Sequence, residues 1–438
     1  MTVLSRDPAN SRALHSGIDR RTMVKSMLFA GGALTWAGWG NAPGVLAQDN
    51  IRLVQMYHQY GEAGTEEAVQ RYAEQYTEEN PNVEIEVIWQ LGDYGQALNA
   101  ALLTDEAPDV FEQNSVTLDQ VRQGQVASLD DIYTDEVRAG FNEISLRAAT
   151  IDGSIYWVKM LDDTGCIYYH KGILEEAGID PPESIDALIE AASALDTGRQ
   201  KGLFVGNDGG IGALLGPMLW SAGGDFLNED GTAPAFNTER AAAAYTKLKE
   251  LNDTGALLIG SPTDYWDPSA FIQQLTAMQW TGLWAMPQII AEVGAENFGV
   301  LPWPASDAEG SPSTFWGGWG ECVGGKSQSL DAAKAFVKWL WIDNTEIQQD
   351  WNLGYGFHVP PRTDAAESAE PLQDPPASDV VSNLNEYGVV PNPLWTGVMG
   401  TALTDAVTSI VRGEAEAADA LASAEATVQE ELDRLLNE

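Results

Sequence analysis

After position 50, the spacing of the hydrophobic residues changes from one typical of a strand to one typical of a helix and back again. Residues 51–57 are mostly apolar and rich in side chains that favour strands, so they predict a β-strand. Over residues 66–79 the apolar positions fall three or four apart, which predicts a helix with Thr65 as its cap. Apolar and acidic residues then alternate over 83–87, which is the period of a second strand.

The alternation of strands and helices continues along the chain. Further elements are predicted as strands at 108–111 and 165–169 and as helices at 96–103, 185–195, 331–342 and 415–436. One more helix is expected to be capped by Asn237 and to end before Gly255, and another is marked by the apolar residues Phe271, Leu275 and Met278. Residues 361–379 are rich in Pro, Ala and acidic residues and predict an exposed loop. This order of elements predicts an α/β fold with a largely parallel sheet.

The N-terminal segment has the features of an export signal. Arg20 and Arg21 precede an uncharged stretch over 26–46, and residues 45–47 form a small-residue cleavage context. The pattern resembles a twin-arginine signal cleaved after Ala47. A retained membrane anchor is the alternative, but five glycines, one Pro and one Asn make the stretch a poor span.

Length and charge limit what the remaining chain can be. Removal of residues 1–47 leaves 391 residues, more than one hydrophobic core usually serves, so two domains are expected. The removed segment carries five Lys or Arg and two Asp or Glu, so its loss takes the formal net charge from −42 to about −45. This charge argues against nucleic acid, anionic lipid and phosphorylated ligands. Because the acidic residues are dispersed, a role in solubility is favoured over a cationic ligand.

The chain contains two cysteines, Cys166 and Cys322. They could pair in an oxidising exterior or remain buried thiols, and the sequence leaves both possibilities open. Their spacing matches no metal site, and no metal or other cofactor is expected.

Tryptophan is concentrated in one part of the chain. Thirteen tryptophans follow the export segment, and nine of them fall between Trp220 and Trp341. Trp284, Trp316 and Trp319 stand in glycine-rich surroundings. Glycine lets a ligand come close, and an indole offers a flat apolar face with one donor, which suits a sugar. Any single tryptophan is more simply explained as part of the core.

Motifs for nucleophilic, metal or nucleotide chemistry are missing from the sequence. It has no Gly-x-Ser-x-Gly, His-Glu-x-x-His or Walker pattern, and only three histidines follow the export segment. Paired carboxylates could still hydrolyse a glycosidic bond, but with 65 Asp and Glu their presence alone carries no information. Carboxylates also bind sugars without cleaving them, by accepting charge-assisted hydrogen bonds from hydroxyls.

Several blocks of sequence, taken together in their order and spacing, carry a family resemblance. They cover nearly the whole chain after residue 47 and comprise 66–83, 107–110, 152–171, 221–237, 277–284, 298–302, 316–320 and 332–339. Together they resemble the extracellular solute-binding proteins of ATP-binding-cassette importers, in the sugar-binding branch that includes maltose-binding protein. The cysteine that anchors lipoproteins of this kind is missing at the cleavage site.

The resemblance implies an α/β, two-lobed, periplasmic-binding-protein-like fold with a hinge of three crossings. Lobe 1 would hold residues 48–165 and 323–388, and lobe 2 would hold 166–321 and 389–438. Cys166 and Cys322 would then lie on hinge strands, where a disulfide could tether two crossings. Ligand would bind between the lobes, which close on it because some contacts exist only in the closed form.

The resemblance also implies which residues touch the ligand. Asp163 matches a carboxylate that accepts sugar hydroxyls, and Trp284 matches a stacking aromatic residue of lobe 2. Asp208 is added from its place in a loop. The full set of expected ligand-binding residues is Tyr57, Gln59, Asp93, Tyr94, Glu112, Asp163, Asp208, Trp220, Trp284, Trp316, Trp319 and Trp395.

The function implied is that of a non-catalytic, extracytoplasmic carbohydrate-binding subunit. It would capture a neutral mono- or oligosaccharide and deliver it to the membrane permease of the importer, as a monomer in the periplasm or outside the cell. Two alternatives remain. A cage of tryptophans and carboxylates also suits polyamines through cation–π contact, and a secreted glycoside hydrolase could use a two-lobed scaffold.

Overall fold

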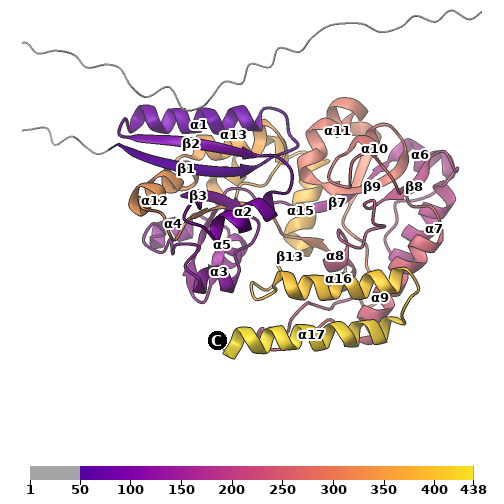
Figure 1. Cartoon of the computed structure of the whole chain (residues 1–438). Coiled ribbons are helices and arrows are strands. Elements are labelled where there is room, and N and C mark those ends of the chain that lie inside the picture. The colour runs from indigo at the N-terminus through magenta and orange to yellow at the C-terminus, as the bar shows by residue number, and fades with distance from the viewer. Residues whose placement is uncertain (1–49, 438) are drawn as a thin grey trace, which may run out of the picture. The chain divides into compact units, whose positions relative to one another are not determined.

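Two larger β-sheets organise residues 50–437, the part of the chain that the computed structural model describes (Figure 1). The first sheet has the order β2-β1-β3-β12-β6, and the second has the order β10-β7-β9-β8. The strands of the first sheet are β1 (Ile51–His58), β2 (Val83–Gln90), β3 (Val110–Gln113), β6 (Trp157–Lys159) and β12 (Gly320–Val323). Those of the second are β7 (Gly165–His170), β8 (Lys201–Phe204), β9 (Thr276–Gly282) and β10 (Phe298–Leu301). The predicted export signal in residues 1–47 lies outside the described residues.

Each sheet contains one strand that runs against the others. In the first sheet β1 pairs in parallel with β2 and β3, whereas β12 pairs antiparallel with β3 and β6. In the second sheet β8 and β9 are parallel, whereas β7 is antiparallel to β9 and β10. The α/β class is therefore confirmed, but both sheets are mixed and not largely parallel, with β7 and β12 as the exceptions to the common strand direction. Both exceptions directly follow a segment that passes from one sheet to the other.

Three segments that link the two sheets lie side by side. Two of them form a short parallel pair, β11 (Thr314–Phe315) with β13 (Gly388–Val389). The backbone N–H of Trp316 donates to the carbonyl of Val389 at 2.8 Å, and the N–H of Gly317 donates to the carbonyl of Asp163 at 2.8 Å. The chain thus has the two-lobed fold with three crossings that the resemblance implied. The lobe boundaries given above remain a prediction.

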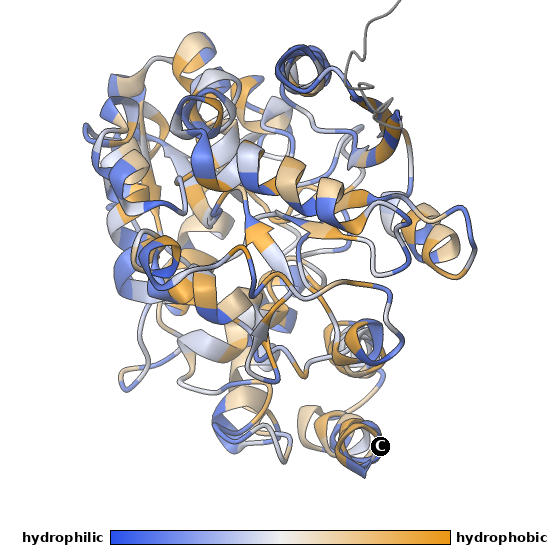
Figure 2. Ribbon diagram, turned by 90° about the vertical axis from the view of Figure 1, so that its left-hand side faces the viewer, coloured by the Kyte–Doolittle hydropathy of each residue, from blue (hydrophilic) through white to orange (hydrophobic). Residues whose placement is uncertain are grey.

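Helices cover the sheets, and most predicted elements are present. The α-helices comprise α1 (Thr65–Glu79), α2 (Tyr94–Leu102), α3 (Leu118–Arg122), α4 (Asp135–Ala139), α5 (Glu143–Ala149), α6 (Lys171–Ala177), α7 (Ile185–Leu195), α8 (Leu215–Ser221), α9 (Glu239–Asp253), α10 (Ser269–Ile272), α11 (Met286–Val293), α12 (Leu330–Lys338), α13 (Thr345–Gly354), α14 (Thr363–Glu367), α15 (Ala377–Tyr387), α16 (Gly397–Val411) and α17 (Ala417–Asn437). A two-stranded ribbon of β4 (Thr150–Ile151) and β5 (Ser154–Ile155) completes the strands. Hydrophobic and hydrophilic residues share the same helices, as amphipathic packing requires (Figure 2).

Two helix caps differ from their predictions. The helix α1 begins at Thr65 itself after Gly64, and the Thr65 hydroxyl donates to the Glu62 carbonyl at 2.7 Å. At α9 the cap is Thr238, whose hydroxyl accepts from the Ala241 N–H at 3.1 Å, and not its neighbour Asn237. Asn237 instead donates to Glu425 of α17 at 2.7 Å, a distant partner that no local pattern reveals.

Two predictions of local structure are wrong. The residues Phe271, Leu275 and Met278 do not share a helix, because α10 ends at Ile272 and β9 begins at Thr276. Leu275 is 37% exposed in the turn between them. Residues 361–379 are not an exposed loop, since this segment contains α14 and the start of α15. Its apolar residues Ala365, Ala369, Leu372 and Ala377 are buried, so alanine there serves packing rather than a flexible linker.

The apolar side chains form three buried clusters. One surrounds the first sheet and includes Phe111 and Trp341, and a second surrounds the other sheet and joins α7, α9, α16 and α17. A third cluster packs Cys166, Trp316 and residues of the 359–384 segment against α11. Leu394 packs against both of the first two clusters and so links them.

Both cysteines are free and buried, which answers the question that the sequence left open. Cys166 is the second residue of β7, and Cys322 lies in β12. Burial raises the pKa of both thiols, so they are held in the protonated, unreactive form.

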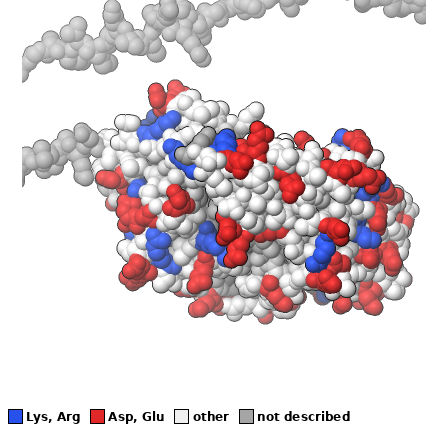
Figure 3. Space-filling view, turned by 90° about the horizontal axis from the view of Figure 1, so that it is seen from below, with Lys and Arg blue, Asp and Glu red and all other residues white. Residues whose placement is uncertain are grey.

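The surface is acidic but mixed. In the view from below, Asp and Glu are spread over the visible face and are interspersed with Lys and Arg (Figure 3). Many of these charges form exposed ion pairs, such as Arg240 with Asp307 at 2.7 Å. Within residues 50–437, no helix is both long and apolar enough to cross a membrane.

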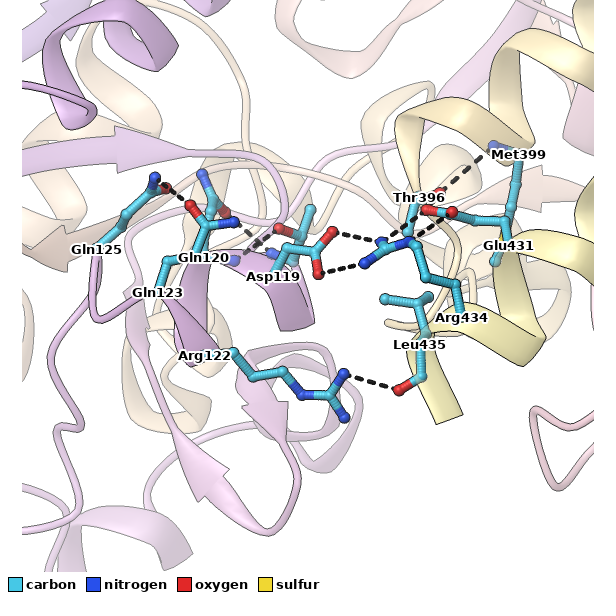
Figure 4. A network of polar contacts seen from close by, with 11 residues as sticks. Asp119, Gln120, Arg122, Gln123, Gln125, Thr396, Met399, Glu431, Arg434 and Leu435 are labelled. Carbon is cyan, nitrogen blue, oxygen red and sulfur yellow. Dashed lines mark hydrogen bonds and ion pairs between the residues drawn. The ribbon is translucent and has the colours of Figure 1, made fainter. Parts of the chain in front are cut away.

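An ion-pair network joins α3, which packs on the first sheet, to the end of α17, which packs on the second (Figure 4). The guanidinium of Arg434 donates to both oxygens of Asp119, at 2.7 and 3.3 Å, and also to Glu431 at 2.8 Å. Arg122 donates to the carbonyl of Leu435 at 2.7 Å. A bidentate pair of this kind orients its partners well, although each exposed ion pair stabilises by only about 0.2–1 kcal/mol.

Loss of the Arg434 contacts is expected to loosen α3 more than it destabilises the whole protein. In Arg434→Gln, hydrogen–deuterium exchange of the α3 amides should rise, while the melting temperature falls by only about 1–3 °C. The matched control is Arg240→Gln, which removes a similar exposed pair within the second lobe. Unchanged exchange in α3 of Arg434→Gln would show that the network does not hold the two elements together.

Candidate ligand-binding site

A buried carboxylate, Glu112, lies at the edge where β1 and β3 end. Parallel strands place their carboxyl ends at one edge of a sheet, where ligands of α/β proteins usually bind. Glu112 is fully buried, and its carboxylate accepts from the Tyr60 hydroxyl at 2.7 Å, from the backbone N–H of His58 and, at 2.5 Å, contacts the His58 ring. A buried charge is tolerated only with such partners, so Glu112 fixes the position of both rings.

Aromatic rings stack around His58. The His58 ring lies between Tyr60, at a centroid distance of 3.9 Å, and Trp319, at 4.1 Å with an interplanar angle of 27°. Tyr94 meets Trp319 edge-on, and its hydroxyl donates to the Glu112 carbonyl at 2.6 Å. Trp319 itself is only half-buried. The structure thus brings together three of the predicted residues, Tyr94, Glu112 and Trp319.

The other predicted residues of this region occupy different environments. Tyr57 is 1% exposed and packs inward beside Trp351, so it supports the sheet from within. Gln59 is exposed just after β1. Asp93 is exposed and caps α2 by accepting from the Gln96 N–H at 2.9 Å.

A second buried carboxylate, Asp163, lies on the first crossing between the sheets. Both of its oxygens lie near Nδ1 of His358, at 3.0 and 3.1 Å, and Nε2 of His358 is 3.5 Å from Glu62. Burial alone would disfavour a charged imidazole. The two carboxylates outweigh burial and raise the pKa of His358 to about 10. His358 is therefore a cation at neutral pH, held between carboxylates from two distant parts of the chain.

Trp284 lies close to this crossing on the side of the second sheet. Gly282, the last residue of β9, pairs with Gly165. The backbone N–H of the next residue, Leu283, donates to the Thr164 carbonyl at 3.1 Å. Thr164 follows Asp163 directly, so the segment that carries Trp284 is bonded to the crossing that carries Asp163. Trp284 is half-buried, and its indole N–H donates to the Trp266 carbonyl at 2.9 Å.

The remaining predicted residues separate into two environments. Trp220 and Trp395 both pack on Phe226, with centroid distances of 5.5 and 4.6 Å. Trp220 also contacts Asp225, which lines a hollow of about 870 Å³ beside the start of α9. Trp316 is 4% exposed and belongs to the third buried cluster.

Asp208 organises a turn in the second lobe. Its two oxygens accept from the N–H groups of Gly210 and Gly212, at 2.9 and 2.8 Å. It is exposed. Within residues 50–437, no group of three or more His, Cys, Asp and Glu is placed to hold a metal ion.

Sequence reasoning missed the two histidines that organise these groups. The sequence shows His58 and His358 as histidines without a motif, because their partners are distant: His58 is 54 residues from Glu112, and His358 is 195 residues from Asp163. The position of His58, one residue after the predicted Tyr57 at the end of β1, is the one available signal.

The charge on His358 predicts a pH dependence of stability. Its pKa in the folded protein, about 10, lies above the ordinary value of 6.5, so its contribution is complete below about pH 6.5 and is lost as pH rises towards 10. Between these limits the wild-type free energy of unfolding should fall by on the order of 2–4 kcal/mol more than that of His358→Asn.

Urea denaturation at several pH values measures this difference. His170→Asn is the control. Because burial lowers the pKa of His170, the effect of this histidine on the free energy of unfolding changes at a lower pH. Parallel curves for wild type and His358→Asn between pH 6.5 and 10 would contradict the assignment of a charged His358.

Comparison with known proteins agrees with this architecture. Residues 62–340 match the family of bacterial extracellular solute-binding proteins. An uncharacterized ABC transporter extracellular-binding protein of Pyrococcus horikoshii is 24% identical over 345 residues, which are 74% of this chain and 75% of that protein.

Solved structures of similar fold cover most of the chain. A solute-binding protein of Thermotoga lettingae bound with α-D-tagatose has a TM-score of 0.75 at 20% identity and covers 87% of this chain and 100% of its own. The GacH receptor of Streptomyces glaucescens, solved without ligand and with acarbose, has a TM-score of 0.73 at 23% identity and covers 89% of this chain and 99% of its own. These likenesses show the fold, and the match over residues 62–340 shows the family. The chain is a member of the bacterial extracellular solute-binding protein family.

Proposed function

We propose that this protein is the carbohydrate-binding subunit of an ABC importer. The observation that carries the proposal is the group formed by Glu112, His58 and Trp319, in which the buried carboxylate holds the His58 ring and this ring stacks on the half-buried indole. A sugar ring has apolar C–H faces that stack on an indole and hydroxyls that donate to carboxylates. A rigid arrangement of both groups favours such a ligand, because little side-chain freedom is lost on binding.

A second pair of proposed ligand contacts, Trp284 and Asp163, lies near the first crossing. Trp284 and Asp163 are carried by segments that hydrogen-bond to each other through Leu283 and Thr164. We propose that a saccharide bound between the lobes contacts both groups. Contacts made to both lobes at once exist only when the lobes are closed, so binding would favour closure.

The wider set of contacts stays as the sequence predicted it. We propose ligand contacts, direct or through neighbouring side chains, at Tyr57, Gln59, Asp93, Tyr94, Glu112, Asp163, Asp208, Trp220, Trp284, Trp316, Trp319 and Trp395. The fully buried members, such as Tyr57, would act by supporting their exposed neighbours.

Family membership supports the cellular role. Members are extracellular solute-binding proteins, and the Pyrococcus relative is an ABC transporter extracellular-binding protein. We propose that a twin-arginine signal cleaved near Ala47 exports the chain and that it works as a monomer beside a membrane permease. The two similar structures that hold tagatose and acarbose support a neutral, polyhydroxylated ligand. We further propose that the ligand is bound without chemical change.

Calorimetric titration of the processed protein with a panel of neutral saccharides tests this function. At least one sugar should bind, and Trp319→Ala should weaken it by about tenfold or more, since a stacking contact is worth about 0.5–1.5 kcal/mol beyond its buried area. Trp339→Ala is the matched control, because Trp339 is also half-buried but bonds to Glu79, on the far end of α1.

Two outcomes, one of the titration and one of a separate incubation, would contradict the proposal. Tight binding of spermidine with no response to any sugar would favour a polyamine ligand held by cation–π contact. New reducing ends after prolonged incubation with oligosaccharides would identify a glycoside hydrolase.

A further inference from the structure

One tryptophan outside the predicted set is conspicuously exposed. Trp266 has 49% of its surface accessible, and it is the only aromatic side chain of residues 50–437 in the exposed class. Tryptophan is seldom left so open, because burying its large apolar surface is strongly favourable. An exposed indole on a protein surface therefore needs a reason.

The loop that carries Trp266 is held firmly from below. The side chain of Asn207 donates to the carbonyls of Ser261 and Thr263, at 3.0 and 3.1 Å, and accepts from two backbone N–H groups at 2.8 and 2.9 Å. The buried side chain of Gln279 donates to the carbonyls on both sides of Trp266, at 3.1 Å to Tyr265 and 2.8 Å to Asp267. The exposed indole is thus mounted on a fixed backbone and not on a loose loop tip.

Trp266 also adjoins predicted ligand-binding residues. Its carbonyl accepts the indole N–H of Trp284 at 2.9 Å, so the two tryptophans are direct neighbours. The same loop lies close to Asp208, because side chains of both surround Gly206. A Cβ atom added to Gly206 would be 3.1 Å from the Asp208 side chain, 3.2 Å from the Asp264 side chain and 3.7 Å from the Tyr265 ring. Although each Asp208 oxygen accepts one backbone N–H, a carboxylate oxygen can accept a second donor, so Asp208 can still bind a hydroxyl.

These contacts link the first crossing to the Trp266 loop through the segment that carries Trp284, and they place Asp208 beside the same loop. Asp163 and Trp284 form the part of the proposed site nearest the crossing. Trp266 and Asp208 add a second indole and a second carboxylate on the second lobe alone. A single sugar ring already supported at Trp284 would leave this outer pair unused.

We propose that Trp266 is a specificity-determining residue that stacks on an additional sugar ring, so that the ligand is an oligosaccharide of two or more residues. The inference rests on the proposed carbohydrate-binding function and adds the chain length of the ligand. A pre-positioned tryptophan suits this role, since it offers a large contact area with few side-chain rotations to restrict.

The test compares sugars of increasing length. Wild type and Trp266→Ala are titrated by calorimetry with glucose, maltose and maltotriose, with mannose, mannobiose and mannotriose, and with xylose, xylobiose and xylotriose. In the series that binds, the wild-type affinity should rise at least tenfold from the monosaccharide to a longer member. Trp266→Ala should lose most of that gain and leave the monosaccharide dissociation constant within about twofold.

Two further variants separate stacking from other effects. Trp266→Phe keeps an aromatic face and should retain most of the gain, whereas Trp339→Ala should retain all of it. Because Trp266 is exposed, its substitution should leave the melting temperature nearly unchanged. A drop of many degrees in Trp266→Ala would show instead that the side chain is structural and would overturn the inference.

The remaining outcomes distinguish this inference from the proposed function. Equal wild-type affinity for monosaccharide and oligosaccharide, or an equal loss for both in Trp266→Ala, overturns the role of Trp266 while sugar binding stands. Unchanged oligosaccharide affinity in Trp266→Ala also overturns the role of Trp266 and leaves the proposed sugar binding intact. Failure of the wild type to bind any member of the three series contradicts the carbohydrate function and, with it, this inference.

Discussion

The pairing of buried carboxylates with histidines is the interaction on which the proposed site depends. Glu112 and Asp163 lie almost wholly out of water, where an unpaired charge would be strongly unfavourable. His58 and His358 satisfy them, and each histidine in turn fixes something else: His58 is the middle ring between Tyr60 and Trp319, and His358 reaches Glu62. Two carboxylates and one indole therefore have defined positions before any ligand arrives.

The strand directions show how the chain brings these groups together. In each sheet the strand that follows a crossing runs against its neighbours, so β12 inserts beside β3 and β7 inserts beside β9. The insertion of β12 brings Trp319 to the end of β3, where Glu112 lies. The hydrogen bond from the Leu283 N–H to the Thr164 carbonyl brings the segment of Trp284 to the first crossing. The network of Arg434 and Asp119 connects the lobes at a further point, on α3 and α17.

Much of this fold could be predicted from the spacing of apolar residues, whereas the partners within the site could not. Apolar residues recur at a regular spacing in β1, β2, α7 and α17. The spacing is clear there because residues that are close in sequence also pack close together. Local pattern fails where a distant contact decides, as at Asn237, which bonds to Glu425 and leaves the cap of α9 to Thr238. The composition of residues 361–379 predicts a loop, but Ala369 and Ala377 of this segment belong to the third cluster.

The candidate site shows the same division. Glu112 and Trp319 could be proposed from their motifs, since one follows a recognisable strand and the other stands among glycines. His58 and His358 could not be paired with their carboxylates, because their contacts join residues far apart in the chain. Trp266 carries no such signal, because no glycine flanks it, and its exposure is a property of the folded loop.

The central claim is that one neutral saccharide is held by groups from both lobes at once. Hydrogen–deuterium exchange with and without a saturating saccharide tests it most directly. The account predicts slower exchange at the ends of β1 and β3 together with slower exchange around Thr164 and Leu283, produced by the same sugar at the same concentration. Protection confined to one of these two regions, or to neither, would contradict it.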